Sequence, residues 1–226
     1  MDSPDKNPIH LAFSDKYTPD HSQRYFEKHQ DGLMRRLSSA RDLQLARKAL
    51  KVAGEPQLVL DLPCGAGRFW PVLAENTTRK IIGADNSADM VRIALAQCSE
   101  ALKPRVEAFQ TSAFAIDMAE KAVDCVFSMR LMHHIGQSEH RITMLKEFHR
   151  VTRDTVILSL WVDGNLKALQ RKKLEAKRHK AGEQNRFVIP AKQIEREFAQ
   201  TGFSVVKHLD FLPKYAMWRV YVLRKQ

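Results

Sequence analysis

The sequence has few of the features that mark exported, membrane-spanning or disulfide-stabilised proteins. Its 226 residues include three cysteines, Cys64, Cys98 and Cys125, and this odd number without close pairing suits reduced thiols. No run of 18 or more apolar residues occurs, and the first thirty residues are polar and contain prolines, which argues against a membrane span or an export signal. We therefore expect a cytoplasmic protein, with one domain as the simplest organisation at this length.

Metal-binding and nucleophilic motifs are also missing from the sequence. His133 and His134 are adjacent, so they cannot both point into one site from a regular helix or strand, and no carboxylate stands beside them at ligand spacing. The chain offers no Ser-His-Asp set, no pair of catalytic carboxylates, no internal repeat and no low-complexity tract. We expect no bound metal.

Positive charge is concentrated near the carboxyl terminus. The formal net charge is +11, but residues 1–162 hold 22 Lys and Arg against 20 Asp and Glu, whereas residues 163–226 hold 15 against 6. Within residues 163–186 the count is eight against three. A basic surface attracts acidic partners such as nucleic acid, an acidic protein face or anionic lipid. Two interpretations stay open: a docking surface, or charge that only keeps the protein soluble.

The stretch QLVLDLPCGAGRFW, residues 57–70, has the pattern of a buried strand, a glycine turn and a helix. A short apolar run between prolines predicts a strand that is buried on both faces of a parallel sheet. Asp61 interrupts that run near its end, where an unpaired buried charge would cost several kcal/mol, so a partner is expected there. Gly65 and Gly67 follow, and glycine lets the backbone approach a ligand closely.

A second carboxylate supports a nucleoside ligand. The next predicted strand, residues 80–85, ends at Asp85, 24 residues after Asp61. An acidic side chain at this place can accept hydrogen bonds from both hydroxyl groups of a ribose. A glycine turn alone would be weak evidence, but the turn followed by this carboxylate favours a nucleoside over an ordinary tight turn.

These motifs resemble those of the class I S-adenosylmethionine-dependent methyltransferases. The family's first motif looks like D-x-G-x-G-x-G and stands here as Asp61-Leu-Pro63-Cys-Gly65-Ala-Gly67, with Pro63 in place of the first glycine. The resemblance continues through IIGADNSADMV at residues 81–91, QTSAF at residues 110–114 and VDCVFSMRLMHHI at residues 123–135. It spans roughly residues 57–160.

The resemblance implies an α/β fold: a Rossmann-like, seven-stranded mixed sheet with helices on both faces. We expect two cap helices in residues 1–56, separated at Ser38-Ser39, and a cofactor-binding core in residues 57–162. A basic helical insertion for substrate recognition is expected in residues 163–187, after the fifth strand. The last helix and an antiparallel pair of strands, residues 203–209 and 216–223, complete a single methyltransferase domain in residues 188–226.

The resemblance also implies that S-adenosylmethionine is the cofactor. Ser112 stands where the family usually has an acidic residue that binds the adenine amino group, so either the Ser112 hydroxyl or the backbone of Ala113 is expected to take that role. The predicted cofactor-binding residues are Asp61, Pro63, Gly65, Gly67, Asp85, Asn86, Ser112, Ala113 and Met129.

Candidates for catalysis are expected at the carboxyl edge of the sheet, where open α/β folds bind ligands. Candidates for covering the methyl group and binding the acceptor are implied by the resemblance, which places cap helices before the sheet and a lid after the fifth strand. His133 or His134 would act as a general base if one is used, or would only form a hydrogen bond with backbone or solvent. Arg130 would orient an anionic acceptor group or simply pair with a carboxylate. Tyr17, His21 and Tyr25 would cover the methyl group, or only pack. The predicted acceptor-binding residues are Tyr25, Trp161, Lys172, Lys173, Lys177 and Arg178.

The acceptor itself is the least constrained prediction. The basic carboxyl-terminal quarter favours a lysine amine on an acidic cytoplasmic protein, and the resemblance extends on this hypothesis to the bacterial lysine methyltransferases of elongation factor Tu. The LMHHI stretch instead resembles enzymes of small molecules and of quinone or lipid intermediates. A non-catalytic nucleoside-binding module is the third hypothesis. Nucleic acid is a less favoured partner, because residues 164–182 lack the aromatic side chains typical of single-strand binding.

Overall fold

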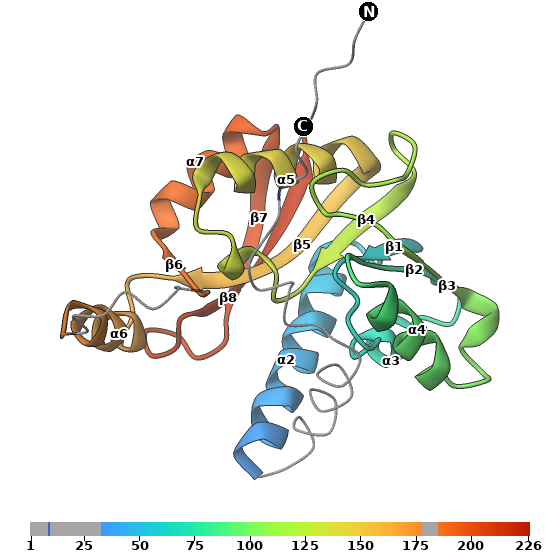
Figure 1. Cartoon of the computed structure of the whole chain (residues 1–226), viewed down its shortest axis with the longest axis horizontal. Helices are drawn as coiled ribbons and strands as arrows, with labels where there is room; N and C mark the ends of the chain where they lie inside the picture. The colour runs from blue at the N-terminus through green and yellow to red at the C-terminus, as the bar shows by residue number, and fades with distance from the viewer. Residues whose placement is uncertain (1–8, 10–32, 178–184) are drawn as a thin grey trace, which may run out of the picture.

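The protein is built around a single mixed β-sheet. The computed structural model describes residue 9, residues 33–177 and residues 185–226. The strands of the sheet follow the order β3-β2-β1-β4-β5-β8-β7, and β6 pairs with β5 outside this path (Figure 1). The strands are β1 (Leu58–Asp61), β2 (Lys80–Asp85), β3 (Val106–Gln110), β4 (Val123–Ser128), β5 (Thr152–Val162), β6 (Val188–Ile189), β7 (Phe203–Asp210) and β8 (Trp218–Lys225). The predicted seven-stranded mixed sheet is confirmed, and the two-residue β6 is an addition to it.

Strand direction places the carboxyl ends of the core strands at one edge. β1 is parallel to both β2 and β4, and β5 is parallel to β4, whereas β8 is antiparallel to β5 and β7. Asp61 is in register with Gly83 of β2 and with Phe127 of β4. The segments that follow β1, β2 and β4 therefore meet at one edge of the sheet, where ligands bind in open α/β folds.

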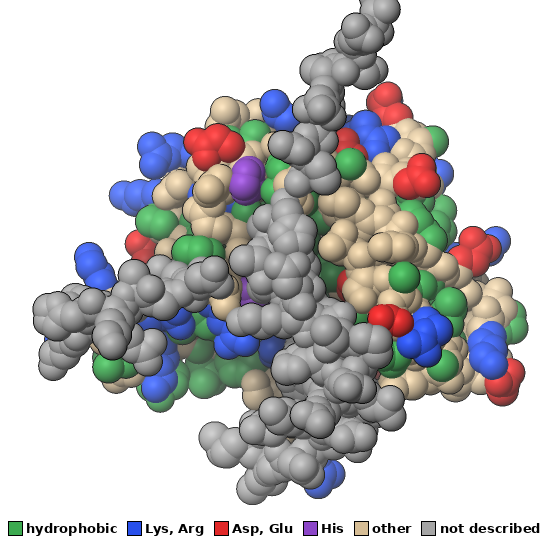
Figure 2. All heavy atoms as spheres, in the orientation of Figure 1, with side chains coloured by type: hydrophobic (Ala, Val, Ile, Leu, Met, Phe, Trp, Pro, Cys, Tyr) green, Lys and Arg blue, Asp and Glu red, His purple; other side chains and the backbone are tan. Residues whose placement is uncertain are grey.

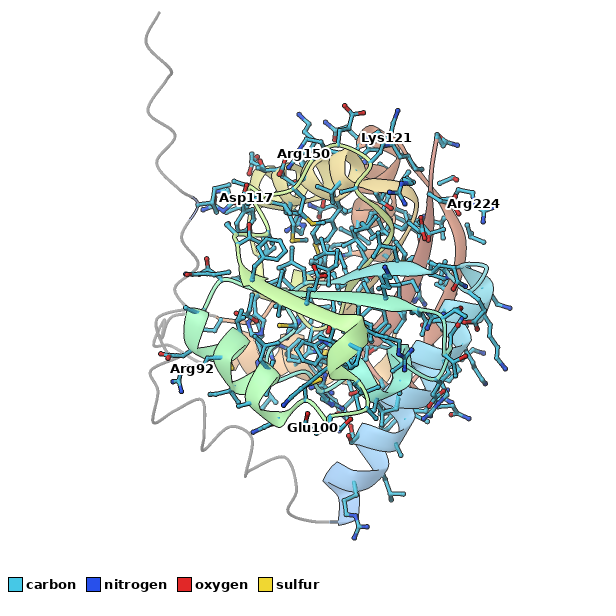
Figure 3. All side chains as sticks on the ribbon, turned by 90° about the vertical axis from the view of Figure 1, so that its right-hand side faces the viewer. Arg92, Glu100, Asp117, Lys121, Arg150 and Arg224 are labelled. Atoms are coloured by element: carbon cyan, nitrogen blue, oxygen red, sulfur yellow. The ribbon has the colours of Figure 1, made fainter. Side chains whose placement is uncertain are left out.

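Helices cover both faces of the sheet because successive strand residues alternate between two cores. One core joins Leu60 of β1 with α5 (Ser138–Val151) and α7 (Ala191–Gln200). The other joins Val59 with α2 (Leu33–Val52), α3 (Trp70–Leu73) and α4 (Ala88–Gln97). Figure 3 shows these layers from the side of β3, with Arg92 of α4 below the sheet and Arg150 of α5 above it.

The helix before the sheet differs from the prediction. α2 runs without interruption through Ser38 and Ser39, so the predicted break there is wrong. Serine destabilises an α-helix by only about half a kcal/mol relative to alanine, and the packing of α2 against the sheet outweighs that weak propensity. Residues before Leu33 that were assigned to the first cap helix, with the candidates Tyr17, His21 and Tyr25, lie outside the described residues.

A helix also follows β5, within the predicted basic insertion. α6 (Leu166–Lys177) begins after Asn165, whose Oδ1 accepts a hydrogen bond from the Ala168 backbone N–H at 2.9 Å. This is a normal N-cap, and it explains why the helix begins there. Arg178 and the side chain of Lys177 lie outside the described residues. In the part of the chain that the structure describes, no helix has the length and apolar composition to cross a bilayer.

Candidate functional site

The glycine turn after β1 is attached to the end of β2 through Asp85. The backbone N–H of Gly65 donates to Asp85 Oδ2 at 3.0 Å, and that of Ser87 donates to Oδ1 at 3.0 Å. Burial raises the pKa of the Asp85 carboxyl, and the N–H groups of Ser87, Gly65 and Asn86 partly oppose that shift. The side chain thus fixes the turn while its carboxylate lies at the carboxyl edge of the sheet.

Two glycines near this turn are required by the ring of Trp70. A Cβ on Gly83 would lie 2.5 Å from Trp70 Cζ2, and one on Gly67 would lie 2.9 Å from Cε3. Gly67 also has a φ of +75°, a conformation that side chains other than glycine rarely adopt. A Cβ on Gly65, in contrast, would meet no atom within 4 Å in the described part of the chain, which leaves the backbone approachable at that residue.

Asp61 is a buried carboxylate without a partner among the described residues. Its side chain is 0% exposed, and neither oxygen has a hydrogen bond with any residue that the structure describes. Burial raises the pKa of Asp61 well above its ordinary value, and the nearby charge of Asp85 adds to the rise. The indole of Trp70 offsets part of the shift without a hydrogen bond of normal geometry, since its Nε1 is also buried and unpartnered.

Replacing Asp61 with asparagine is expected to stabilise the protein in the absence of cofactor by about 1–2 kcal/mol, because it removes an unpaired buried charge. The folded pKa of Asp61 lies above its unfolded value, so the wild type loses stability as pH rises from the ordinary carboxyl range through that raised pKa. Urea unfolding measured at about pH 5 and about pH 8 should show that the free energy of unfolding falls less between these pH values in the variant than in the wild type. The exposed Asp117→Asn is the control, and an unchanged pH dependence in Asp61→Asn would contradict the expectation.

An S-adenosylmethionine site fits these residues. The unpartnered Asp61 carboxylate, the approachable Gly65 backbone and the Asp85 carboxylate gather at the carboxyl edge of β1 and β2. Carboxylates that accept hydroxyl and amine hydrogens, beside a glycine turn, are the donor and acceptor set that this nucleoside needs.

The other predicted cofactor residues lie nearby with different surroundings. Asn86 is exposed, and its carbonyl accepts a hydrogen bond from Gln110 Nε2. The Ser112 hydroxyl accepts one from the Phe114 backbone N–H at 3.2 Å, and Ala113 is buried. The side chain of Met129 packs within the core formed by α2, α3 and α4.

A group of aromatic and basic side chains lies beyond the ends of β4 and β5. The His133 ring centroid is 5.0 Å from Trp161 and 4.7 Å from Trp218. Arg130 lies over the Trp218 ring at 5.0 Å, and Arg171 and Arg186 lie over Trp161 at 4.9 and 5.8 Å. We call these residues the aromatic-basic cluster: Arg130, His133, Trp161, Arg171, Arg186 and Trp218.

Two ring nitrogens of the cluster have no hydrogen-bond partner among the described residues. They are His133 Nδ1 and Trp161 Nε1, in side chains that are 3% and 7% exposed. Buried polar atoms are normally paired, so an unpaired N–H here is able to serve a ligand. The cluster combines three guanidinium groups with flat rings and therefore suits an anionic group.

The two histidines that were predicted as candidates for a general base are neutral in this environment. Burial lowers the pKa of His133 to about 2, and His134, Arg186 and Arg130 add to the shift. Burial also lowers the pKa of His134, whose Nδ1 lies 2.6 Å from the Asn185 carbonyl oxygen. Both imidazoles are thus uncharged near pH 7, and His133 is a weak base.

An acidic residue of α2 links the two parts of the site, and sequence reasoning missed it. Asp42 is 5% exposed and is bonded to Arg130 Nη2 and, at 2.9 Å, to Arg68 Nη2. Arg68 follows the glycine turn, so one carboxylate ties the cofactor side to the aromatic-basic cluster. The residues before and after Asp42 show ordinary helical spacing, which gives no signal for this role.

The predicted acceptor-binding residues are only partly brought together. Trp161 lies in the cluster, whereas Lys172 and Lys173 are exposed on α6. Arg171, which was not predicted, is the residue of α6 that contacts Trp161. No group of three His, Cys, Asp or Glu side chains suited to a metal occurs within the described ranges.

Comparison with known proteins finds similarity in the part of the chain that holds the glycine turn. Residues 59–155 match the model of a family described as a methyltransferase domain. This match covers less than half of the chain and includes most of β1, the glycine turn and Asp85, and together with the fold it supports S-adenosylmethionine as the cofactor.

Similar proteins act on different acceptors. A tRNA (carboxymethyluridine(34)-5-O)-methyltransferase of Xenopus tropicalis is 30% identical over 133 residues, which are 58% of this chain and 20% of that protein. The demethylmenaquinone methyltransferase of Lactococcus lactis is 32% identical over 97 residues, or 42% of this chain and 37% of the relative. The chain therefore spans well under half the length of these curated relatives.

Solved structures share the fold at low sequence identity. The magnesium protoporphyrin IX methyltransferase of Synechocystis, solved with bound S-adenosylhomocysteine, has a TM-score of 0.74 and 16% identity over 94% of this chain and 97% of its own. A [4+2]-cyclase also matches, with a TM-score of 0.60 and 17% identity over 80% of this chain and 81% of its own. The fold by itself thus accommodates other chemistry.

Proposed function

We propose that the chain methylates an anionic oxygen, such as a carboxylate, of an acceptor held by the aromatic-basic cluster. The observation that carries this proposal is the gathering of Arg130, Arg171 and Arg186 around the rings of Trp161 and Trp218. Arginine binds carboxylates through two parallel hydrogen bonds, and flat rings orient a flat acceptor.

The proton balance supports an oxygen anion as the nucleophile. When bound, S-adenosylmethionine supplies a methyl group on a positively charged sulfur. A carboxylate oxygen forms its bond to that methyl as the sulfur–carbon bond breaks, and no proton has to be removed. This suits a site in which the His133 pKa is about 2. The protein then contributes alignment and the exclusion of water.

A lysine acceptor is less compatible with this site. An ammonium group would be repelled by Arg171 and Arg186, and Arg130 is already paired with Asp42. The ammonium must also lose a proton before it attacks, which requires a base. The tRNA relative's name instead specifies an oxygen and a carboxymethyl group. The methylation of elongation factor Tu stays a prediction that the relatives reported above do not support.

A small-molecule or quinone-precursor acceptor is the second candidate. The likeness to the demethylmenaquinone methyltransferase favours it, as does a cluster of rings able to stack on a flat acceptor. A non-catalytic nucleoside-binding module remains the third, and it predicts cofactor binding without transfer.

The proposal is tested by incubating the protein with methyl-labelled S-adenosylmethionine and cell lysate, then measuring label in protein, RNA and organic extract. The double variant R171S/R186S is expected to lower transfer at least about tenfold, because two charge-assisted contacts are lost, with S-adenosylmethionine affinity unchanged. The exposed pair R92S/R153S is the control. Transfer equal to wild type in R171S/R186S would refute the role of the cluster, and binding without any transfer would favour the non-catalytic module.

A further inference from the structure

The outer surface of α6 and the loop between β7 and β8 expose large apolar side chains beside lysines. Leu169 and Leu174 of α6 are 59% and 61% exposed, although leucine is usually buried. The surface, which we call the leucine-lysine surface, also exposes Leu166, Lys167, Lys172, Lys173, Leu212, Lys214 and Tyr215.

Hydrogen bonds hold the two elements of the leucine-lysine surface together. The backbone N–H groups of Leu166 and Lys167 donate to the carbonyls of Lys214 and Tyr215, each at 3.0 Å. Lys167 Nζ also lies 5.3 Å from the Tyr215 ring centroid. Figure 1 shows α6 and the loop at the lower left, and Figure 2 shows blue and green side chains mixed in the same part of the molecule.

We propose that the leucine-lysine surface docks the protein onto an anionic lipid bilayer. Aliphatic side chains enter the boundary between headgroups and acyl chains, while lysine stems extend to the phosphates and tyrosine lies at headgroup level. The positive charge of this surface complements anionic headgroups. The proposal does not depend on the identity of the acceptor.

The composition of the surface favours lipid over protein or RNA. Protein interfaces are depleted in lysine at their centres, and leucine is under-represented among their energetic anchors. Single-stranded RNA binding uses stacked aromatic side chains, whereas Tyr215 is the one aromatic residue that the described part of this surface exposes. Exposed leucines add nothing to phosphate binding, but they do explain insertion into a bilayer.

Docking by this surface would also bring the aromatic-basic cluster close to the bilayer. α6 exposes the side chains of Leu169 and Leu174, while Arg171 of the same helix contacts Trp161. One helix thus connects the docking surface with the cluster.

Co-sedimentation with vesicles tests the proposal on the full chain. Wild-type protein is expected to pellet with vesicles of phosphatidylcholine and phosphatidylglycerol, to stay in solution with phosphatidylcholine alone, and to be released by added salt. The variants L169S/L174S and K172S/K173S should each bind at least about tenfold more weakly. Matched controls are Leu95→Ser on α4 and K48S/K51S on α2, which should bind as wild type.

Several outcomes would overturn the docking proposal. They are no sedimentation of wild type with either vesicle, equal binding to both, or wild-type binding by L169S/L174S. If labelled RNA binds and K172S/K173S abolishes that binding while vesicles do not bind, the surface serves nucleic acid instead. Thermal melting of each variant confirms folding, since substitutions at exposed sites change stability little. Methyl transfer is measured separately, so its failure would not affect this result.

Discussion

Replacing Asp85 with alanine is expected to weaken the binding of S-adenosylmethionine by about 3 kcal/mol, or somewhat more than a hundredfold. The carboxylate lies at the end of β2, and its oxygens already accept hydrogen bonds from Gly65 and Ser87. The variant loses this fixation of the glycine turn and also the acceptor that we propose for the ribose hydroxyl groups. Titration calorimetry with the full chain measures the effect.

The matched control for Asp85 is Asp89→Ala in the first turn of α4. Asp89 lies four residues after Asp85 in the sequence and is not placed at the strand end. Its carboxylate pairs with Arg92 at 2.9 Å. Asp89→Ala should bind S-adenosylmethionine as wild type does. Asp85→Asn, which keeps the shape and removes the charge, should lie between the two. Equal affinity in Asp85→Ala and wild type would show that the nucleoside is bound elsewhere.

Removal of Glu197 is expected to give the largest loss of stability, about 3–5 kcal/mol, because it leaves a buried guanidinium unpaired. Arg141 donates from Nε and Nη2 to the two oxygens of Glu197 at 2.8 and 2.6 Å, and both residues are at least 95% buried. Arg141 Nη1 also donates to the carbonyls of Ile135 and Gly136, just after the 3-10 helix that carries His133. The pair therefore joins α5 and α7 to the loop that follows His133 and His134.

Urea unfolding of Glu197→Ala, of Arg141→Met and of the double variant R141M/E197L measures this effect. Burial opposes the charged form of Glu197, but hydrogen bonds from Arg141 and Ser138 outweigh it and lower the pKa. This part of the stability is present above the ordinary carboxyl range and is lost as pH falls through the lowered pKa. The double variant R141M/E197L should cost less than Glu197→Ala alone. A loss below about 1 kcal/mol in Glu197→Ala would contradict the expected burial cost.

The cofactor side of the site could be predicted because its signals are local in sequence. A buried apolar run, Asp61, two glycines and Asp85 all occur within residues 58–85, and parallel strands bring their ends to one edge. The antiparallel pair at the end of the chain was equally visible as alternation, and β7 and β8 confirm it.

On the acceptor side, Arg130, His133 and Trp161 were predicted from their position, but their partners were not, because the contacts join distant segments. Asp42 and Arg130 are 88 residues apart, and Arg141 and Glu197 are 56 apart. Helical spacing predicts which face of α2 packs, but not which polar side chain meets an arginine from another element. The Ser38-Ser39 prediction was wrong for a related reason, since tertiary packing overrides a weak local preference.

The chemical stability of the transferred label tests the central claim most directly. Methyl groups transferred from labelled S-adenosylmethionine should be released as volatile methanol when the isolated product is treated with mild alkali, because a methyl ester of a carboxylate is hydrolysed there. Protein with R171S/R186S should yield correspondingly less. Label that withstands alkali and is recovered on lysine would contradict methylation of an anionic oxygen.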